Sequence, residues 1–206
     1  MPSTTDCLIV VDVQNDFLPG GALAVPAGDE VVPVVNALAA RFSSVVLTQD
    51  WHPADHRSFA AAHPGRAPFD TVELPYGPQV LWPVHCVQAS PGAALAADLA
   101  VPHAFVILRK GANRFVDSYS AFREADGTDT GLAALLSARG ITRVHVCGLA
   151  TDFCVAWTAL DARAAGFETV LVDDASRAID LDGSLAAARA RLEAAGVVTL
   201  DAEEIA

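Results

Sequence analysis

The chain has 206 residues, of which 52% are hydrophobic, and a formal net charge of -12 with only 13 lysines and arginines. This length and apolar content suffice for one well-filled core, and no linker-like stretch divides the sequence, so we expect a single domain over residues 1–206. The acidic balance lacks the basic surface that nucleic acids or anionic lipids require, so neither is an expected partner. Without an apolar signal segment or membrane-spanning stretch, we expect a cytoplasmic protein.

Short apolar runs alternate with Ala/Leu-rich segments of helical length along the chain. Such runs are typical of strands that are buried on both faces and joined by crossovers. The expected strands are residues 8–13, 44–48, 105–109, 143–147, 169–172 and 197–200. The expected helices are residues 29–41, 131–139, 152–165 and 182–195, and a glycine suited to a left-handed helix end follows each of the last three. The pattern predicts an α/β fold, a three-layer α/β/α sandwich with a mostly parallel, Rossmann-like central sheet.

Residues 50–102 depart from this alternation. The segment is rich in proline and contains four of the six histidines. A segment of this length without regular elements, inside a compact domain, is usually functional. We therefore expect an insertion at about residues 50–102 that binds metal and substrate.

Four apolar runs lead to residues that can do chemistry. Three of them end at Asp12, Asp50 and Lys110, and Cys154 follows the fourth at the start of an expected helix. In an open parallel sheet the carboxyl ends of the strands lie on one edge, where ligands bind. The four side chains are therefore expected to converge on one active site.

The thiol of Cys154 is the candidate nucleophile. Thr151 or Asp152 can cap the expected helix, which places the thiol in its first turn. A helix N-terminus and a nearby cation, here Lys110, both lower the pKa of a thiol and favour the thiolate. A buried carboxylate at Asp12 can take the thiol proton and later deliver it to a leaving amine. Taken alone, Asp12 could be a structural cap, Lys110 a surface lysine and Cys154 a core thiol. The occurrence of all three at strand ends favours catalysis.

A metal site is expected beside the thiol. Asp50 and His52 point the same way if the segment after the second strand stays extended, and His85 is the expected third ligand. One carboxylate and two imidazoles, with open positions for water, suit one catalytic Zn²⁺, Fe²⁺ or Mn²⁺. His56 is a rival ligand or a supporting group around the site.

The remaining cysteines and histidines carry no expected chemistry. Cys7 and Cys147 lie in apolar runs and are read as buried, inert thiols, and Cys86 is read as a packing residue. His103 and His145 are read as surface or strand residues, solvated or hydrogen-bonded. We expect all four cysteines to be free.

With these residues laid out, the chain resembles the nicotinamidase/pyrazinamidase branch of the isochorismatase-like cysteine hydrolases over nearly its whole length. The matching pieces are VDVQNDFLPGGALAV at 11–25, DWHPADHRSF at 50–59, WPVHCVQ at 82–88, KGANRFVDSYSAF at 110–122 and GLATDFCV at 148–155. The resemblance implies hydrolysis of nicotinamide to nicotinate and ammonia, and of pyrazinamide to pyrazinoate, through a cysteine thioester in NAD salvage. Small-molecule amides are thus the expected partners, and the resemblance leaves open whether the chain forms a homo-oligomer.

The resemblance also assigns roles to residues. It matches Asp12, Lys110 and Cys154 to the catalytic triad and Asp50, His52 and His85 to the metal ligands. It implies a cis peptide between Leu149 and Ala150, with the amides of Ala150 and Cys154 as an oxyanion hole. The pocket wall around a flat pyridine ring would be formed by Phe17, Leu23, Trp82 and Tyr119.

Two other functions stay open at this stage. One is a different amide or carbamoyl hydrolase of the same architecture, whose members generally lack the Asp50, His52 and His85 set. The other is a non-catalytic metal-binding or redox module that uses Cys154 and Cys86. Ammonia release from nicotinamide that depends on metal and on Cys154 distinguishes all three.

Overall fold

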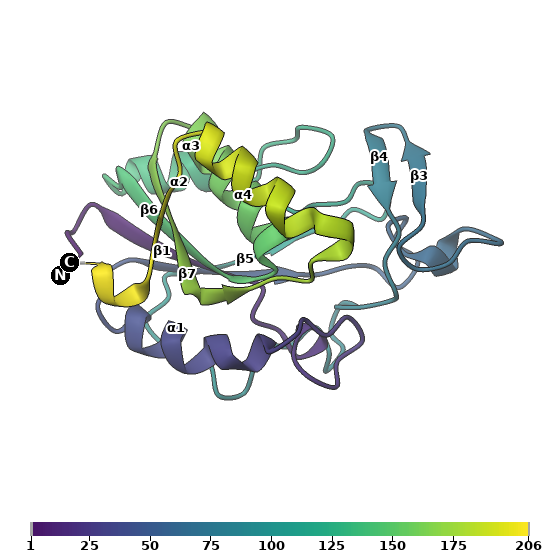
Figure 1. Ribbon diagram of the computed structural model, residues 1–206, viewed down its shortest axis with the longest axis horizontal. Helices are drawn as coiled ribbons and strands as arrows, with labels where there is room; N and C mark the ends of the chain where they lie inside the picture. Colours follow the sequence, from purple (N-terminus) through teal and green to yellow (C-terminus); the bar gives the residue numbers. More distant parts are fainter. Residues whose placement is uncertain (1, 206) are drawn as a thin grey trace.

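Six parallel strands form the central sheet of the computed structural model, which describes residues 2–205 (Figure 1). From one edge to the other the order is β5, β2, β1, β6, β7 and β8. Their bounds are β1 Asp6–Val11, β2 Val45–Asp50, β5 Val106–Lys110, β6 Arg143–Leu149, β7 Glu168–Arg177 and β8 Val198–Leu200. Every neighbouring pair is parallel, so all six carboxyl ends lie on one edge of the sheet.

Helices cover both faces of the sheet (Figure 1). They are α1 Val31–Ala39, α2 Leu132–Ala138, α3 Ala156–Ala164 and α4 Ser184–Ala194, with short 3-10 turns at Asn15–Phe17, Gly28–Glu30, Ala60–Ala62, Leu181–Gly183 and Ala202–Glu204. In β1, Leu8 and Val10 pack toward α1, whereas Ile9 and Val11 pack toward the other three helices. The alternation buries both faces of the strand, and the predicted three-layer sandwich is confirmed.

The expected elements are present with altered ends. Gly140, Gly166 and Gly196 follow α2, α3 and α4 with positive φ, as predicted. The first strand ends at Val11, earlier than expected, because the backbone at Asp12 turns into the left-handed region with φ 50°. Strand β7 runs on to Arg177 through a polar stretch that carried no strand signal.

The segment between β2 and β5 holds an antiparallel hairpin, β3 Thr71–Leu74 and β4 Gly77–Val80, which the sequence did not predict. The rest of the segment is irregular, with isolated bridges from His52 to Val87 and from Phe59 to Trp82. The hairpin stands apart from the main sheet at the end of the molecule opposite the chain termini (Figure 1). Among the helices in the described part of the chain, none is long and apolar enough to cross a membrane.

Candidate active site

Lys110 occupies the centre of a buried polar cluster at the carboxyl edge of the sheet. Its ammonium Nζ lies 2.7 Å from Asp12 Oδ2 and 3.3 Å from Cys154 Sγ, and it also forms an ion pair with Asp50. It donates a further hydrogen bond of 3.1 Å to the carbonyl oxygen of Ser118. The structure thus brings together the four residues that follow the apolar runs. Asp50 and Lys110 are the last residues of β2 and β5, and they are direct partners in the parallel register.

The charges in this cluster depend on one another. Burial would lower the pKa of Lys110, but Asp12 and Asp50 outweigh it and keep the ammonium charged. Burial raises the pKa of Asp12, and Lys110 opposes that rise. Burial also raises the pKa of the Cys154 thiol, because the lowering expected from Lys110 is smaller than the combined effect of burial and the two carboxylates. The resting nucleophile is therefore a thiol, and a neighbouring base must remove its proton.

Two buried side chains hold the carboxylates in place. The hydroxyl of Thr48 donates to Asp12 Oδ1 at 2.6 Å and accepts the Asp12 backbone N–H at 3.1 Å. The amide of Gln14 donates to the carbonyl of Asp50 and accepts its backbone N–H, at 2.9 and 2.8 Å. Sequence reasoning missed both residues, although Gln14 lies in the quoted VDVQNDF piece.

The nucleophile lies on a sharp turn between β6 and α3. Gly148 has φ 116°, and a Cβ there would come within 2.1 Å of the carbonyl oxygen of Val11. A cis peptide joins Leu149 to Ala150, as the resemblance implies, and Thr151–Val155 form a π-helical turn that contains Cys154. The thiol therefore precedes α3 instead of lying in its first turn.

The predicted helix cap is wrong. Neither Thr151 nor Asp152 caps the helix with its side chain. The buried carboxylate of Asp152 instead accepts the backbone N–H groups of Ile179 and Asp180, at 3.1 and 2.8 Å, and the hydroxyl of Ser184. Asp152 therefore ties the nucleophile turn to the segment after β7.

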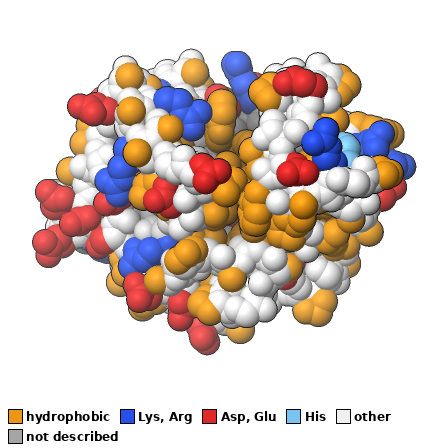
Figure 2. Space-filling view, turned by 45° about the vertical axis from the view of Figure 1, so that its right-hand side comes forward, with side chains coloured by type: hydrophobic (Ala, Val, Ile, Leu, Met, Phe, Trp, Pro, Cys, Tyr) orange, Lys and Arg blue, Asp and Glu red, His pale blue; other side chains and the backbone are white. Residues whose placement is uncertain are grey.

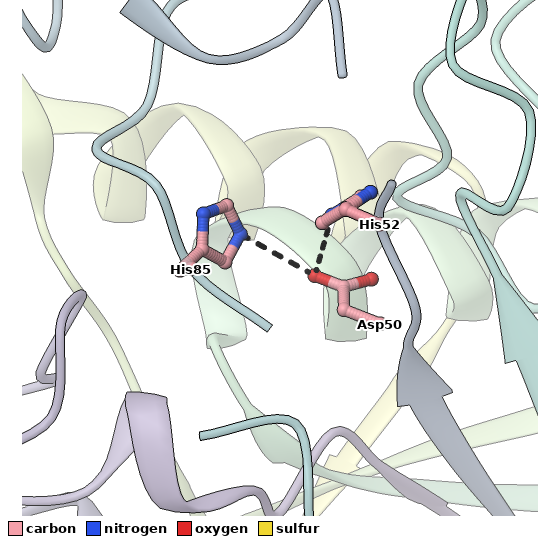
Figure 3. Close-up of side chains that lie close together, drawn as sticks. All are labelled: Asp50, His52 and His85. Atoms are coloured by element: carbon pink, nitrogen blue, oxygen red, sulfur yellow. Dashed lines mark ion pairs between the residues drawn. The ribbon is translucent and has the colours of Figure 1, made fainter. Parts of the chain in front are cut away.

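Asp50, His52 and His85 point toward one another (Figure 3). Asp50 Oδ2 lies 3.5 Å from His52 Nε2 and 3.7 Å from His85 Nε2. The Nδ1 atom of each histidine faces a backbone carbonyl, that of Gly111 at 3.0 Å and that of Pro83 at 2.8 Å, so Nδ1 carries the hydrogen in both rings. Three lone pairs that converge in this way repel one another unless a cation lies between them. The residues therefore fit a divalent metal ion.

A small cavity lies beside the thiol and this trio. Its wall contains the four predicted pocket residues Phe17, Leu23, Trp82 and Tyr119, together with Asp50, His52, His85, Asp117, Ala150, Phe153, Cys154 and Ile179. Trp82 meets Phe153 edge to face at 4.9 Å and Tyr119 at 6.3 Å. On the side of the molecule turned forward in Figure 2, the surface is hollowed between hydrophobic side chains. A flat aromatic ring suits such a wall.

A sequence profile of the isochorismatase domain matches residues 6–204. The chain belongs to the isochorismatase family. Over 207 aligned residues it is 53% identical to a nicotinamidase of Acinetobacter baylyi, covering 100% of this chain and 97% of the relative. Its fold matches a nicotinamidase/pyrazinamidase of Acinetobacter baumanii with a TM-score of 0.99 at 53% identity, covering all of both chains. A pyrazinamidase of Pyrococcus horikoshii solved in complex with zinc matches with a TM-score of 0.78 at 38% identity, over 96% of this chain and 99% of that chain.

In this isochorismatase-family chain, both ring nitrogens of His56 have partners within the chain. Its Nε2 faces the carbonyl oxygen of Val116 at 3.2 Å and must therefore carry the hydrogen. Its Nδ1 accepts the backbone N–H of Ser58 at 3.2 Å and lies 2.7 Å from the Ser58 hydroxyl. The ring packs against His52 with 4.4 Å between centroids. His56 thus packs against His52 and is held by partners within the chain.

The other predicted thiols are free and buried, as expected. Burial raises the pKa of Cys86 and Cys147 well above the usual thiol range, and it raises that of Cys7 to about 12. His145 lies in β6 as predicted, but neither ring nitrogen has a hydrogen-bond partner among the described residues. The reading of His145 as solvated or hydrogen-bonded is therefore wrong.

Three cavity residues were missed. Phe153 and Asp117 lie inside the quoted pieces GLATDFCV and KGANRFVDSYSAF, where attention to neighbours of Cys154 and Tyr119 could have found them. Ile179 lies just after β7, in a polar stretch without a motif. The position of Ile179 in the wall depends on the hydrogen bond from its backbone N–H to Asp152, which cannot be predicted from the local sequence.

Proposed function

We propose that this chain is a nicotinamidase, which hydrolyses nicotinamide to nicotinate and ammonia and pyrazinamide to pyrazinoate, and so serves NAD salvage. The observation that carries the proposal is the contact of one buried ammonium, Lys110, with both the Asp12 carboxylate and the Cys154 thiol at the wall of an aromatic-lined cavity. The 53% identity to a nicotinamidase over the whole chain supports the same substrate.

Asp12 starts the acylation half of the reaction. Its carboxylate takes the proton of the Cys154 thiol, and the sulfur forms a bond to the carboxamide carbon. The backbone N–H groups of Ala150 and Cys154 donate to the oxyanion that develops on the carboxamide oxygen, an effect worth about 3 kcal/mol per donor in comparable sites. Asp12 then protonates the leaving nitrogen, the C–N bond breaks, ammonia departs, and a thioester remains.

The same carboxylate serves the second half. Asp12 takes a proton from water, the resulting hydroxide attacks the thioester carbon, and the C–S bond breaks. The thiolate recovers its proton from Asp12, and the carboxylic acid product ionises. Lys110 stays charged throughout and stabilises whichever neighbour, Asp12 or Cys154, bears the negative charge.

Asp50 Oδ2, His52 Nε2 and His85 Nε2 would hold a divalent ion, for which zinc, iron and manganese are the candidates. The zinc complex of the Pyrococcus pyrazinamidase supports this reading. When bound, the ion supplies a Lewis-acid contact that can hold the ring nitrogen of the substrate. The chain itself orients the ring through Phe17, Leu23, Trp82 and Tyr119, which leave a narrow apolar slot for a flat heterocycle. Four free thiols agree with a reducing compartment, so we place the reaction in the cytoplasm.

The test is ammonia release from a panel of amides by the purified protein, with and without chelator. Nicotinamide and pyrazinamide should be cleaved, and the Cys154→Ala variant should lose all measurable activity. The matched control is Cys7→Ala, which removes a buried thiol at the other end of β1 and should keep full activity. Faster turnover of carbamoyl or ureido compounds than of nicotinamide, or activity that survives in Cys154→Ala, would refute the proposal.

A further inference from the structure

Four buried ionisable side chains lie in or next to the wall of the catalytic cavity. Asp12, Asp50 and Asp117 are buried carboxylates, and Lys110 is the buried ammonium that pairs with the first two. Lys110 is ion-paired with Asp12 and Asp50 but not with Asp117. Buried carboxylates without a cationic partner are costly, so a group of this kind favours a further cation nearby.

Asp117 is the carboxylate that lacks a cationic partner. It is 3% exposed and lines the cavity, and none of the ion pairs within residues 2–205 includes it. Its oxygens accept hydrogen bonds from neutral donors, the Gln79 amide at 2.7 Å and the backbone N–H of Ser118 at 2.9 Å. These donors fix the carboxylate in place but leave its charge unbalanced.

The position of this carboxylate relates it to the proposed metal site. One of its oxygens and ring nitrogens of His52 and His56 all lie within 4.8 Å of one another, yet Asp117 does not come this close to Asp50, His52 and His85 together. Two ligands of one ion, each about 2.2 Å from it, are at most about 4.4 Å apart. Asp117 therefore lies outside the first coordination shell of an ion held by Asp50, His52 and His85, but close to the His52 ring.

We propose that Asp117 is an outer carboxylate of the metal centre, which accepts a hydrogen bond from water bound to the ion and supplies charge that tight binding of the ion requires. The proposal rests on the proposed function in one respect, since it takes Asp50, His52 and His85 as the ion's ligands. Outer carboxylates of this kind typically change metal affinity by about 10- to 100-fold when they are removed. Asp117 is thus a positioning residue for the ion and needs no contact with the reacting atoms.

The experiment measures the dissociation constant for Mn²⁺ by competition with a chelator, in the wild type, in Asp117→Asn and in a control, Asp55→Asn. Asp55 is 60% exposed and pairs with Arg114 on the surface, so its loss should leave the dissociation constant unchanged. In Asp117→Asn the constant should rise 10- to 100-fold. A value within twofold of the wild type would overturn the proposal, as would a wild type that binds no Mn²⁺.

Thermal unfolding without metal separates this role from a structural one. The asparagine oxygen can still accept the Ser118 backbone N–H, and Gln79 Nε2 keeps the Val80 carbonyl and the Tyr119 hydroxyl as acceptors. Because the substitution also removes an unbalanced charge, the metal-free variant should melt no lower than the metal-free wild type. A lower melting temperature together with unchanged Mn²⁺ affinity would show that Asp117 serves only the fold. Nicotinamide turnover at saturating Mn²⁺ tests the proposed function by itself, because activity in the wild type supports that function whatever the affinity of Asp117→Asn.

Discussion

His145 should make the stability of this protein fall in mild acid. The ring is 4% exposed within β6, it packs edge to face against Phe42 at 5.0 Å, and neither nitrogen has a partner within the described chain. Burial lowers the pKa of His145 from 6.5 to about 4; Asp6 slightly opposes this shift and Arg143 adds to it. The folded protein therefore holds this imidazole neutral at pH values where the unfolded chain takes up a proton.

The sign and size of the effect follow from linkage. Between pH 6.5 and 4 the unfolded state binds more protons than the folded state, so the free energy of unfolding decreases as the pH falls through this window. Each unit of pKa difference corresponds to about 1.4 kcal/mol, so the full effect is about 3 kcal/mol. At pH 4.5 about 2.5 kcal/mol of it should already be lost relative to pH 7.5.

The perturbation is His145→Leu, and the assay is urea unfolding of both proteins at pH 7.5 and at pH 4.5. At pH 7.5 the two should have similar stability, because the leucine replaces a ring whose nitrogens make no hydrogen bonds. At pH 4.5 the variant should be more stable than the wild type by about 2.5 kcal/mol. Other titrating groups are common to both proteins and cancel in the comparison. A stability difference that is the same at both pH values would refute the reasoning.

Two further substitutions test the supports of the site. In Gly111→Ala the new Cβ would lie 2.4 Å from His52 Cε1, at a backbone φ of 65°, so the His52 ring must move. The affinity for Mn²⁺ should therefore fall at least about tenfold in a chelator competition. Unchanged affinity would contradict the ligand position assigned to His52. In Asp152→Ala the backbone N–H of Ile179 and the hydroxyl of Ser184 lose their acceptor. The free energy of unfolding, measured in urea, should fall by about 2–4 kcal/mol. A loss below about 1 kcal/mol would show that water replaces the carboxylate.

The layers of the fold could be predicted from the sequence because burial on both faces leaves a plain signal. The strand DCLIVV of β1 is buried at every position, and its neighbour β6 is buried at all but its first residue. Polar residues directly after such runs have few structural reasons to be there. Asp50 and Lys110 were found as site candidates for this reason, and the structure places them side by side.

The parts that could not be predicted depend on contacts between distant segments. In the hairpin, β3 alternates polar and apolar residues but is only four residues long, and β4 contains glycine and proline in GPQV, so the pairing is what identifies the two strands. From the sequence Asp152 looked like a helix cap. The groups that actually donate hydrogen bonds to its carboxylate lie 27 to 32 residues further along the chain, so no local pattern could reveal them. The contact of the His56 ring with the Val116 carbonyl joins positions 60 residues apart and could not be predicted from local pattern.

Asp50 joins the two halves of the site. One of its oxygens, Oδ1, contacts Lys110, while Oδ2 faces the nitrogens of His52 and His85. Although burial opposes it, Lys110 holds the pKa of Asp50 well below its usual range, so the carboxylate stays ionised. The charge that fixes Lys110 beside Asp12 and Cys154 is therefore the same charge that would hold a metal ion. In the proposed mechanism, substrate orientation and proton transfer are therefore coupled electrostatically through this one side chain. This role accounts for an acidic residue at the end of β2, where a strand buried on both faces would otherwise favour an apolar one.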